Sequence, residues 1–106
     1  MMRLELSKQW MQKANEKYLK GYYNSAIKLY SKIIVENAFN YEALFNRGMA
    51  YHDLGMYDAA VADFTKAIEL KQDFSEAYKC RALSYYSLNE NQKALQDYNV
   101  AVRLVS

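Results

Sequence analysis

The hydrophobic positions of this chain follow a helical rhythm that is interrupted and then resumes. Over residues 41–54, apolar side chains recur at intervals of three and four, and the same spacing returns over residues 57–70. Such spacing is typical of amphipathic helices with one apolar face each. Gly55 lies between the two segments and suits the end of a helix, because glycine tolerates the left-handed backbone that follows a last turn. The pattern predicts a helical hairpin over residues 41–74.

The hairpin pattern occurs three times, at a fixed spacing of 34 residues and without gaps. We place the copies at residues 7–40, 41–74 and 75–106, within one domain over residues 1–106. A fixed period of this length indicates stacked supersecondary units. Asn40 is the expected N-cap of the second copy, and Asp73 and Ser75 are the candidates for the third. The aligned columns include Trp10, Leu44 and Tyr78; Ala14, Gly48 and Ala82; Gly21, Gly55 and Asn89; Ala26, Ala60 and Ala94; and Tyr30, Phe64 and Tyr98.

These columns closely resemble tetratricopeptide repeats (TPR), and the resemblance covers residues 7–106. It implies an all-α fold, a right-handed α-solenoid of three antiparallel helix-turn-helix repeats with six helices. It also implies that the first helix of each repeat lines a concave face. Asn89 stands where glycine is usual, and the proline that commonly ends a unit is missing.

The large side chains of the repeat columns predict the core, because bulky and small positions alternate as interlocking helices require. A column of basic residues is expected to cover the helix interface with aliphatic stems while its charges remain in water. The basic column is Lys13, Arg47 and Arg81. The predicted core residues are Trp10, Leu44, Tyr51, Phe64, Tyr85 and Tyr98.

The concave face implied by the resemblance carries a mixture of apolar and polar side chains. Apolar surface with a polar rim commonly marks an interaction site, and methionine adapts its shape to varied ligands. We therefore predict a scaffold that binds a peptide or helix of a partner protein in this groove. The predicted groove residues are Met11, Asn15, Tyr18, Phe45, Asn46, Met49, His52, Lys79, Leu83 and Tyr86.

The segments 13–16 and 46–48 resemble the co-chaperone branch of the family. That branch often holds the acidic C-terminal tail of a heat-shock chaperone with two lysines, two asparagines and an arginine. Both asparagines are present here, but all three cations are replaced, one of them by a carboxylate; Lys79 stands nearby. A co-chaperone-like module that binds such a tail through a partial clamp is therefore the alternative. In chain order the clamp positions are Met11, Asn15, Asn46, Glu76 and Cys80.

Composition narrows the range of expected partners and cellular compartments. The net charge is +2, without a basic run, so neither nucleic acid nor an anionic membrane is an expected partner. Cys80 is the only cysteine, which excludes an internal disulfide and favours a reducing compartment. No segment approaches the roughly 20 apolar residues of a membrane helix, and the N-terminus shows no signal-peptide core. We expect a cytoplasmic protein.

No catalytic constellation is evident. His52 is the only histidine, which rules out a site with several histidine ligands. Cys80 and His52 form a weak candidate pair, because nothing places a third group to orient the base. We expect His52 to be an exposed groove side chain and Cys80 to be a packing residue. The sequence predicts no enzyme, no cofactor and no metal.

The last predicted helix finishes where the sequence ends, and it carries apolar side chains. This leaves two further expectations open: a homodimer through the C-terminal repeat, or a piece of a longer protein whose covering helix lies elsewhere. The residues expected to contribute to an uncovered strip are Tyr86, Leu88, Leu95, Val102 and Val105.

Overall fold

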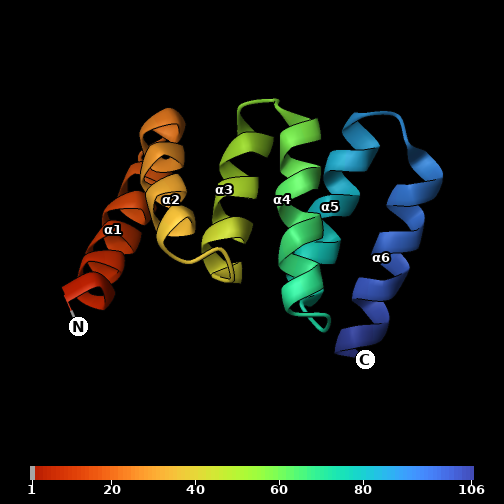
Figure 1. Cartoon of the computed structure of the whole chain (residues 1–106). Coiled ribbons are helices and arrows are strands. Elements are labelled where there is room, and N and C mark those ends of the chain that lie inside the picture. The colour runs from red at the N-terminus through yellow and green to blue at the C-terminus, as the bar shows by residue number, and fades with distance from the viewer. Residues whose placement is uncertain (1) are drawn as a thin grey trace.

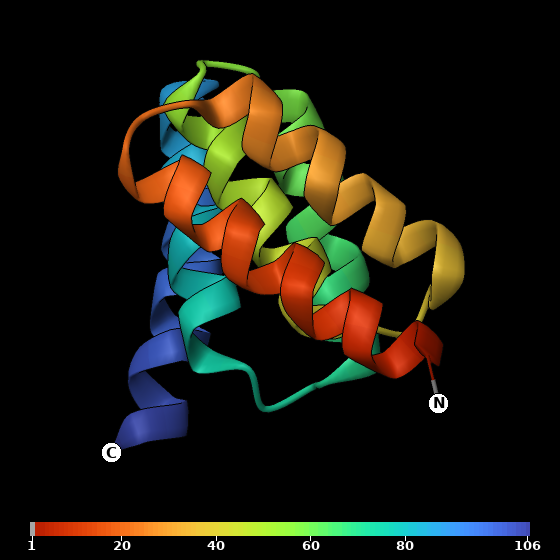
Figure 2. The same ribbon diagram turned by 90° about the vertical axis from the view of Figure 1, so that its left-hand side faces the viewer.

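The computed structural model describes residues 2–106, which form six helices in three successive antiparallel hairpins (Figure 1). Each hairpin packs against the next, and the stack extends over 43 × 25 × 20 Å. Viewed from its N-terminal end, the first hairpin is inclined relative to the last (Figure 2), so the stack twists as it grows. The predicted all-α architecture of six helices is confirmed. The helices are α1 (Met2–Leu19), α2 (Tyr23–Glu36), α3 (Tyr41–Asp53), α4 (Tyr57–Leu70), α5 (Ser75–Ser87) and α6 (Asn91–Val105).

The turn within each hairpin uses a left-handed residue at the same column. Gly21 and Gly55 have φ of 83° and 81°, and Asn89 has φ of 62°. Each turn closes by a backbone bond that reaches back to the last turn of the helix, such as Glu90 N to Tyr85 O at 2.9 Å. Asparagine tolerates this region better than most side chains. The third repeat therefore keeps the turn although it lacks the usual glycine.

The helix starts differ between the second and third repeats. Asn40 caps α3 as predicted, because its side-chain oxygen accepts a hydrogen bond from Ala43 N at 3.0 Å. The prediction that Asp73 or Ser75 caps α5 is wrong. Phe74 occupies the column of Asn40 and makes no side-chain cap. The Ser75 hydroxyl donates instead to the carbonyl of Ala101 on α6, at 3.3 Å.

The core lies between the two layers of helices and is built from close approaches. A Cβ on Gly48 would lie 2.7 Å from the ring of Phe64, so only glycine allows α3 and α4 to meet here. Leu44 and Phe64 are buried, as predicted, while Trp10, Tyr51 and Tyr85 are partly buried.

The prediction that Tyr98 is a core residue is wrong, because its side chain is 53% exposed. Tyr30 and Phe64 occupy the same column and are buried, since α3 packs on α2 and α5 packs on α4. In the described residues no helix stacks on the outer side of α6. The burial of this column is therefore a property of stacking rather than of the repeat itself.

The charges of the basic column were expected to remain in water, but its two arginines form ion pairs instead. Arg47 donates from Nε and Nη2 to the carboxylate of Asp63, both at 2.8 Å, and from Nη1 to Ser31 at 3.1 Å. The bidentate pair links α3 to α4, and the bond to Ser31 adds α2. The next repeat has the same arrangement around Arg81, which contacts Asp97 and Thr65. The correction follows from the buried aspartates, which require a charged partner.

Candidate functional site

The helices α1, α3 and α5 form the inner layer of the stack. Besides its hairpin partner and its sequence neighbours, α1 contacts α3, and α3 contacts α5. No corresponding contacts join α2 to α4 or α4 to α6 among the described residues. The first helices of the repeats therefore converge on the concave side, and their inward faces form a shared surface.

Three neighbouring hollows lie along this inner surface. The first lies between α1 and α3 and has a volume of about 280 Å³. The second, between α3 and α5, measures about 200 Å³, and the third, between α5 and α6, about 440 Å³. Met49 lines the first and second hollows, and Leu83 lines the second and third. The shared side chains make the hollows one trough, which we call the concave groove, and which crosses all three repeats.

The structure places the sequence-predicted residues at different depths on the inner surface, and Met11 lines none of the three hollows. Lys79, Leu83 and Tyr86 are exposed. Met11, Asn15, Tyr18, Asn46, Met49 and His52 are partly buried.

Phe45 departs from the prediction that it belongs to the groove surface. Its side chain is only 8% exposed. Its ring packs against Phe74 at 4.8 Å and against Phe64 at 5.7 Å between centroids. Phe45 is therefore a packing residue that supports the floor of the concave groove, not a residue of its surface.

A small polar network marks the end of the groove in the first repeat. Asn15 Oδ1 accepts hydrogen bonds from Tyr30 Oη at 2.5 Å and from Asn46 Nδ2 at 3.4 Å. Asn46 Nδ2 also lies 3.8 Å from the sulfur of Met11. Because the oxygen of Asn15 is engaged, its amide nitrogen is oriented to donate to a ligand. Tyr30 was predicted only through its core column, and nothing in the repeat pattern indicated its hydroxyl contact.

The middle of the groove is held by polar contacts between helices. His52 Nδ1 lies 2.9 Å from the hydroxyl of the buried Ser84, and its ring packs against Tyr57. His52 is thus a partly buried, hydrogen-bonded side chain rather than the exposed one expected. Tyr18 donates to Asp53 across α1 and α3. Burial and the bond to Asp53 raise the pKa of Tyr18 above its ordinary value, so the hydroxyl stays protonated.

Cys80 is partly buried in the floor of the second hollow. Burial, followed by the negative charge of Glu76, raises the pKa of its thiol to about 11. At neutral pH the group is therefore an uncharged thiol, and it is a poor nucleophile because thiolate is the reactive form. The positive charge of Lys79 lowers the pKa of the thiol, but by less than burial and Glu76 raise it. Among the described residues, no group of three or more His, Cys, Asp or Glu side chains could hold a metal ion.

Comparisons with known proteins agree with this architecture. The tetratricopeptide repeat family model matches residues 41–74. The first TPR of Spaghetti (RPAP3), solved with the HSP90 peptide SRMEEVD, is 26% identical, with a TM-score of 0.91 over 94% of this chain and 79% of that one. The TPR domain of Arabidopsis OM64 is 28% identical, with a TM-score of 0.93 over 96% and 84% of the two chains. The TPR2B domain of yeast Sti1, solved with an Hsp70 peptide, is 25% identical, with a TM-score of 0.91 over 94% and 80%. No significant match was found among curated proteins.

Residues 41–74 match the tetratricopeptide repeat model, and the chain as a whole has the fold of TPR domains of about three repeats. More closely, it is similar in structure to the TPR domains of the co-chaperones RPAP3 and Sti1. This fold is a protein–protein interaction module and typically has no catalytic role. Within residues 2–106, no helix is both long enough and apolar enough to cross a membrane.

Proposed function

We propose that this domain binds a peptide or helical segment of a partner protein in the concave groove, through apolar side chains. The observation that carries the proposal is the continuity of the trough across three repeats, with Met49 and Leu83 at its joints. An extended or helical segment can contact all three hollows at once. Asn15 supplies a polar donor at one end, and exposed Leu83 and Tyr86 supply apolar contacts at the other.

The alternative ligand is the acidic tail of a chaperone, because the structurally similar TPR domains of RPAP3 and Sti1 were solved with HSP90 and Hsp70 peptides. Asn15 and Asn46 support it, since both occupy clamp columns and face the groove. The other clamp columns oppose it. Glu76 brings a negative charge, and the raised pKa of Cys80 leaves that position uncharged. The groove therefore favours an apolar segment over a tail rich in carboxylates.

Leu83→Asp tests the primary proposal. Panning a random peptide library on the wild-type domain supplies ligands, and calorimetry measures their affinity. Leu83 is 53% exposed and lines two hollows. Burying a leucine contributes about 1.5–3 kcal/mol, so its loss should weaken binding roughly tenfold to a hundredfold.

Phe39→Asp is the matched control, because Phe39 is an exposed apolar side chain in the loop between α2 and α3 and lines no hollow described above. It should leave the affinity unchanged. If the selected peptides bind the Leu83→Asp domain as well as the wild type, the concave groove is not their site.

Self-assembly through the C-terminal repeat is a second candidate, favoured by one observation. Helix α6 exposes a row of large apolar side chains, whereas the equivalent columns of α2 and α4 are largely covered by the next hairpin. Two members of the row, Leu95 and Tyr98, also line the third hollow. Such a face promotes association. The row comprises Leu95, Tyr98, Val102 and Val105.

We expect sedimentation equilibrium to show a dimer of the 106-residue chain that Leu95→Asp and Val102→Asp together convert to a monomer. A wild-type chain that stays monomeric at high concentration would contradict this second candidate. An unchanged dimer in the double variant would place the interface elsewhere.

A further inference from the structure

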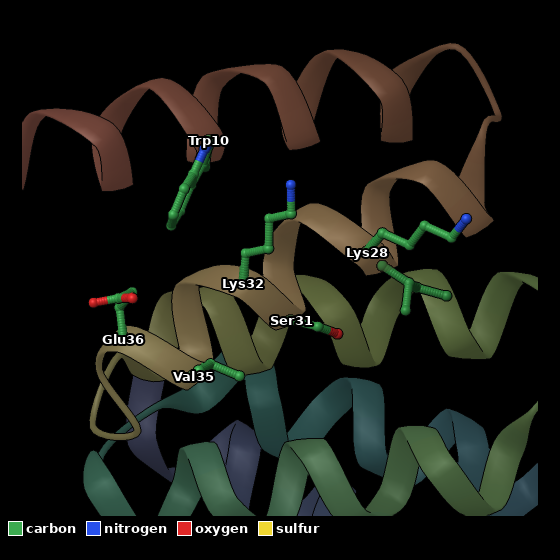
Figure 3. A pocket seen from close by; sticks show the side chains of 7 residues that line it. Trp10, Lys28, Ser31, Lys32, Val35 and Glu36 are labelled. Atoms are coloured by element: carbon green, nitrogen blue, oxygen red, sulfur yellow. The ribbon is translucent and has the colours of Figure 1, made fainter. Parts of the chain in front are cut away.

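Another open depression lies on the first repeat, away from the concave groove. It is an open trough of about 640 Å³ between α1 and α2, within the size range of ligand pockets in proteins. Its walls are Trp10 on α1 and one stripe of α2 that includes Ile27 and Val35 (Figure 3). None of its lining residues belongs to the three hollows of the concave groove. We call it the Trp10 trough.

The floor of the Trp10 trough is apolar. Trp10 is partly buried and presents its ring toward α2, as Figure 3 shows. Val35 is 83% exposed and lines the trough together with Trp10 and Ile27. A tryptophan beside an exposed aliphatic side chain provides a large contact area at low conformational cost, as in binding hot spots. The floor is therefore suited to an apolar side chain of a partner.

Three charged side chains line this trough, the cations Lys28 and Lys32 and the anion Glu36. The ammonium of Lys32 lies 5.9 Å from the centroid of the Trp10 ring, a cation–π contact that holds the charge beside the floor. Lys28 lies one turn earlier on α2 and is exposed. Ser31 is engaged, since its oxygen accepts from Arg47 at 3.1 Å. Glu36 lies at the opposite end from Lys28 (Figure 3). The charged side chains thus follow one another along the trough as Lys28, Lys32 and Glu36, with positive charge at one end and negative charge at the other.

We propose that the Trp10 trough docks an acidic amphipathic segment of a partner protein. An apolar side chain of that segment packs on Trp10 and Val35, and its carboxylates pair with Lys28 and Lys32. The charge grading sets the direction, because the acidic part of the segment faces the two lysines. The occupant is a protein segment rather than single-stranded nucleic acid, since one partly buried aromatic ring and two lysines fall short of the continuous basic path that such strands require.

Trp10 provides the readout, because it is the only tryptophan of the chain. The probe is a synthetic amphipathic peptide of about fourteen residues, with leucines at helical spacing and glutamates on the other face. A matched peptide carries lysine at each glutamate position. We expect a saturable change in Trp10 emission with the glutamate peptide, weakened by salt because the contacts are exposed ion pairs. The lysine peptide should give none.

Neutralisation of the two lysines tests the assignment. Lys28→Gln with Lys32→Gln should weaken binding of the glutamate peptide by up to about thirtyfold, since each exposed pair contributes up to about 1 kcal/mol and the two anchor the same segment. Lys66→Gln is the matched control, because Lys66 is the exposed counterpart of Lys32 in the second repeat. It should leave the affinity unchanged. Leu83→Asp should also leave it unchanged, which separates this trough from the concave groove.

Several results would overturn the proposal. They are the absence of a saturable emission change, equal binding of the two peptides, loss of binding in the Leu83→Asp domain, and displacement of the glutamate peptide by single-stranded oligodeoxythymidine. Circular dichroism of each variant confirms that the helices are intact, so that a loss of binding reports the site.

Discussion

Installing three cations at the clamp columns of the inner helices α1 and α5, near Asn15 and Asn46 of the concave groove, is expected to create a receptor for the peptide SRMEEVD. The variant combines Met11→Lys, Glu76→Lys and Cys80→Arg, the columns that hold cations in the co-chaperone clamp. Asn15 and Asn46 already face the groove and are joined by a hydrogen bond between their side chains. A hydrogen bond between charged groups contributes roughly 1.5–3 kcal/mol, and solvent exposure favours the lower value. Three such bonds amount to about 4 kcal/mol, or roughly a thousandfold gain in affinity.

Fluorescence anisotropy with a labelled SRMEEVD peptide measures this gain. A charge-matched control places the same added charge outside the groove, with Glu69→Lys, Gln92→Lys and Asn99→Lys at exposed positions. Salt screens charges that lie this far from the bound peptide. The control variant should therefore gain little affinity for SRMEEVD. Asn15→Ala in the triple variant should remove most of the gain, because it deletes the polar donor of the clamp. Tight binding by the wild-type domain would show instead that the existing side chains suffice for an acidic tail.

The architecture could be predicted from the sequence because it is encoded redundantly. Each small column recurs in three repeats, so a single departure does not obscure the pattern. Asn89 is one such departure, and its left-handed φ of 62° preserves the turn. Stacking in one register follows from the constant period, and the helix bounds of the second repeat follow from Asn40 and Gly55.

The depth of individual side chains could not be predicted, because it depends on contacts that break the repeat. Phe45 shares a helical face with Met49, but the rings of Phe74 and Phe64 pack against it. Phe74 replaces Asn40 in its column, so the pattern predicted a cap where the structure has an aromatic contact. Tyr98 looks like Phe64 in sequence, but no further hairpin packs on it in the described chain.

The ion pairs at the helix interfaces correspond to a sequence pattern that no single repeat column indicates. Asp63 follows Arg47, and Asp97 follows Arg81, at the same separation in two repeats. The first repeat obscures the relation, because Leu29 stands in the column of the two aspartates. Paired columns of opposite charge on facing helices predict a link more reliably than a single basic column.

Asp63→Ala is expected to destabilise the domain by about 2–4 kcal/mol, the largest stability effect that we expect from a single substitution. The side chains of Arg47 and Asp63 are 20% and 8% exposed, so removing the carboxylate leaves a guanidinium with little water and two unmet donors. Breaking a buried pair in this way typically costs about 3–5 kcal/mol, and the residual exposure of Arg47 lowers that figure. Urea unfolding followed by circular dichroism measures the change.

The double variant Arg47→Met with Asp63→Leu is the control, since an apolar pair of similar volume is often as stable as the ions that it replaces. The first repeat already has Leu29 in the aspartate column and retains its hairpin. We expect the double variant to recover most of the loss, which assigns the cost to the stranded charge rather than to lost packing. Asp97→Ala should cost less, because the link around Arg81 joins α6, which among the described helices packs only against α5. Equal losses at the two positions would mean that the end of the stack unfolds together with its centre.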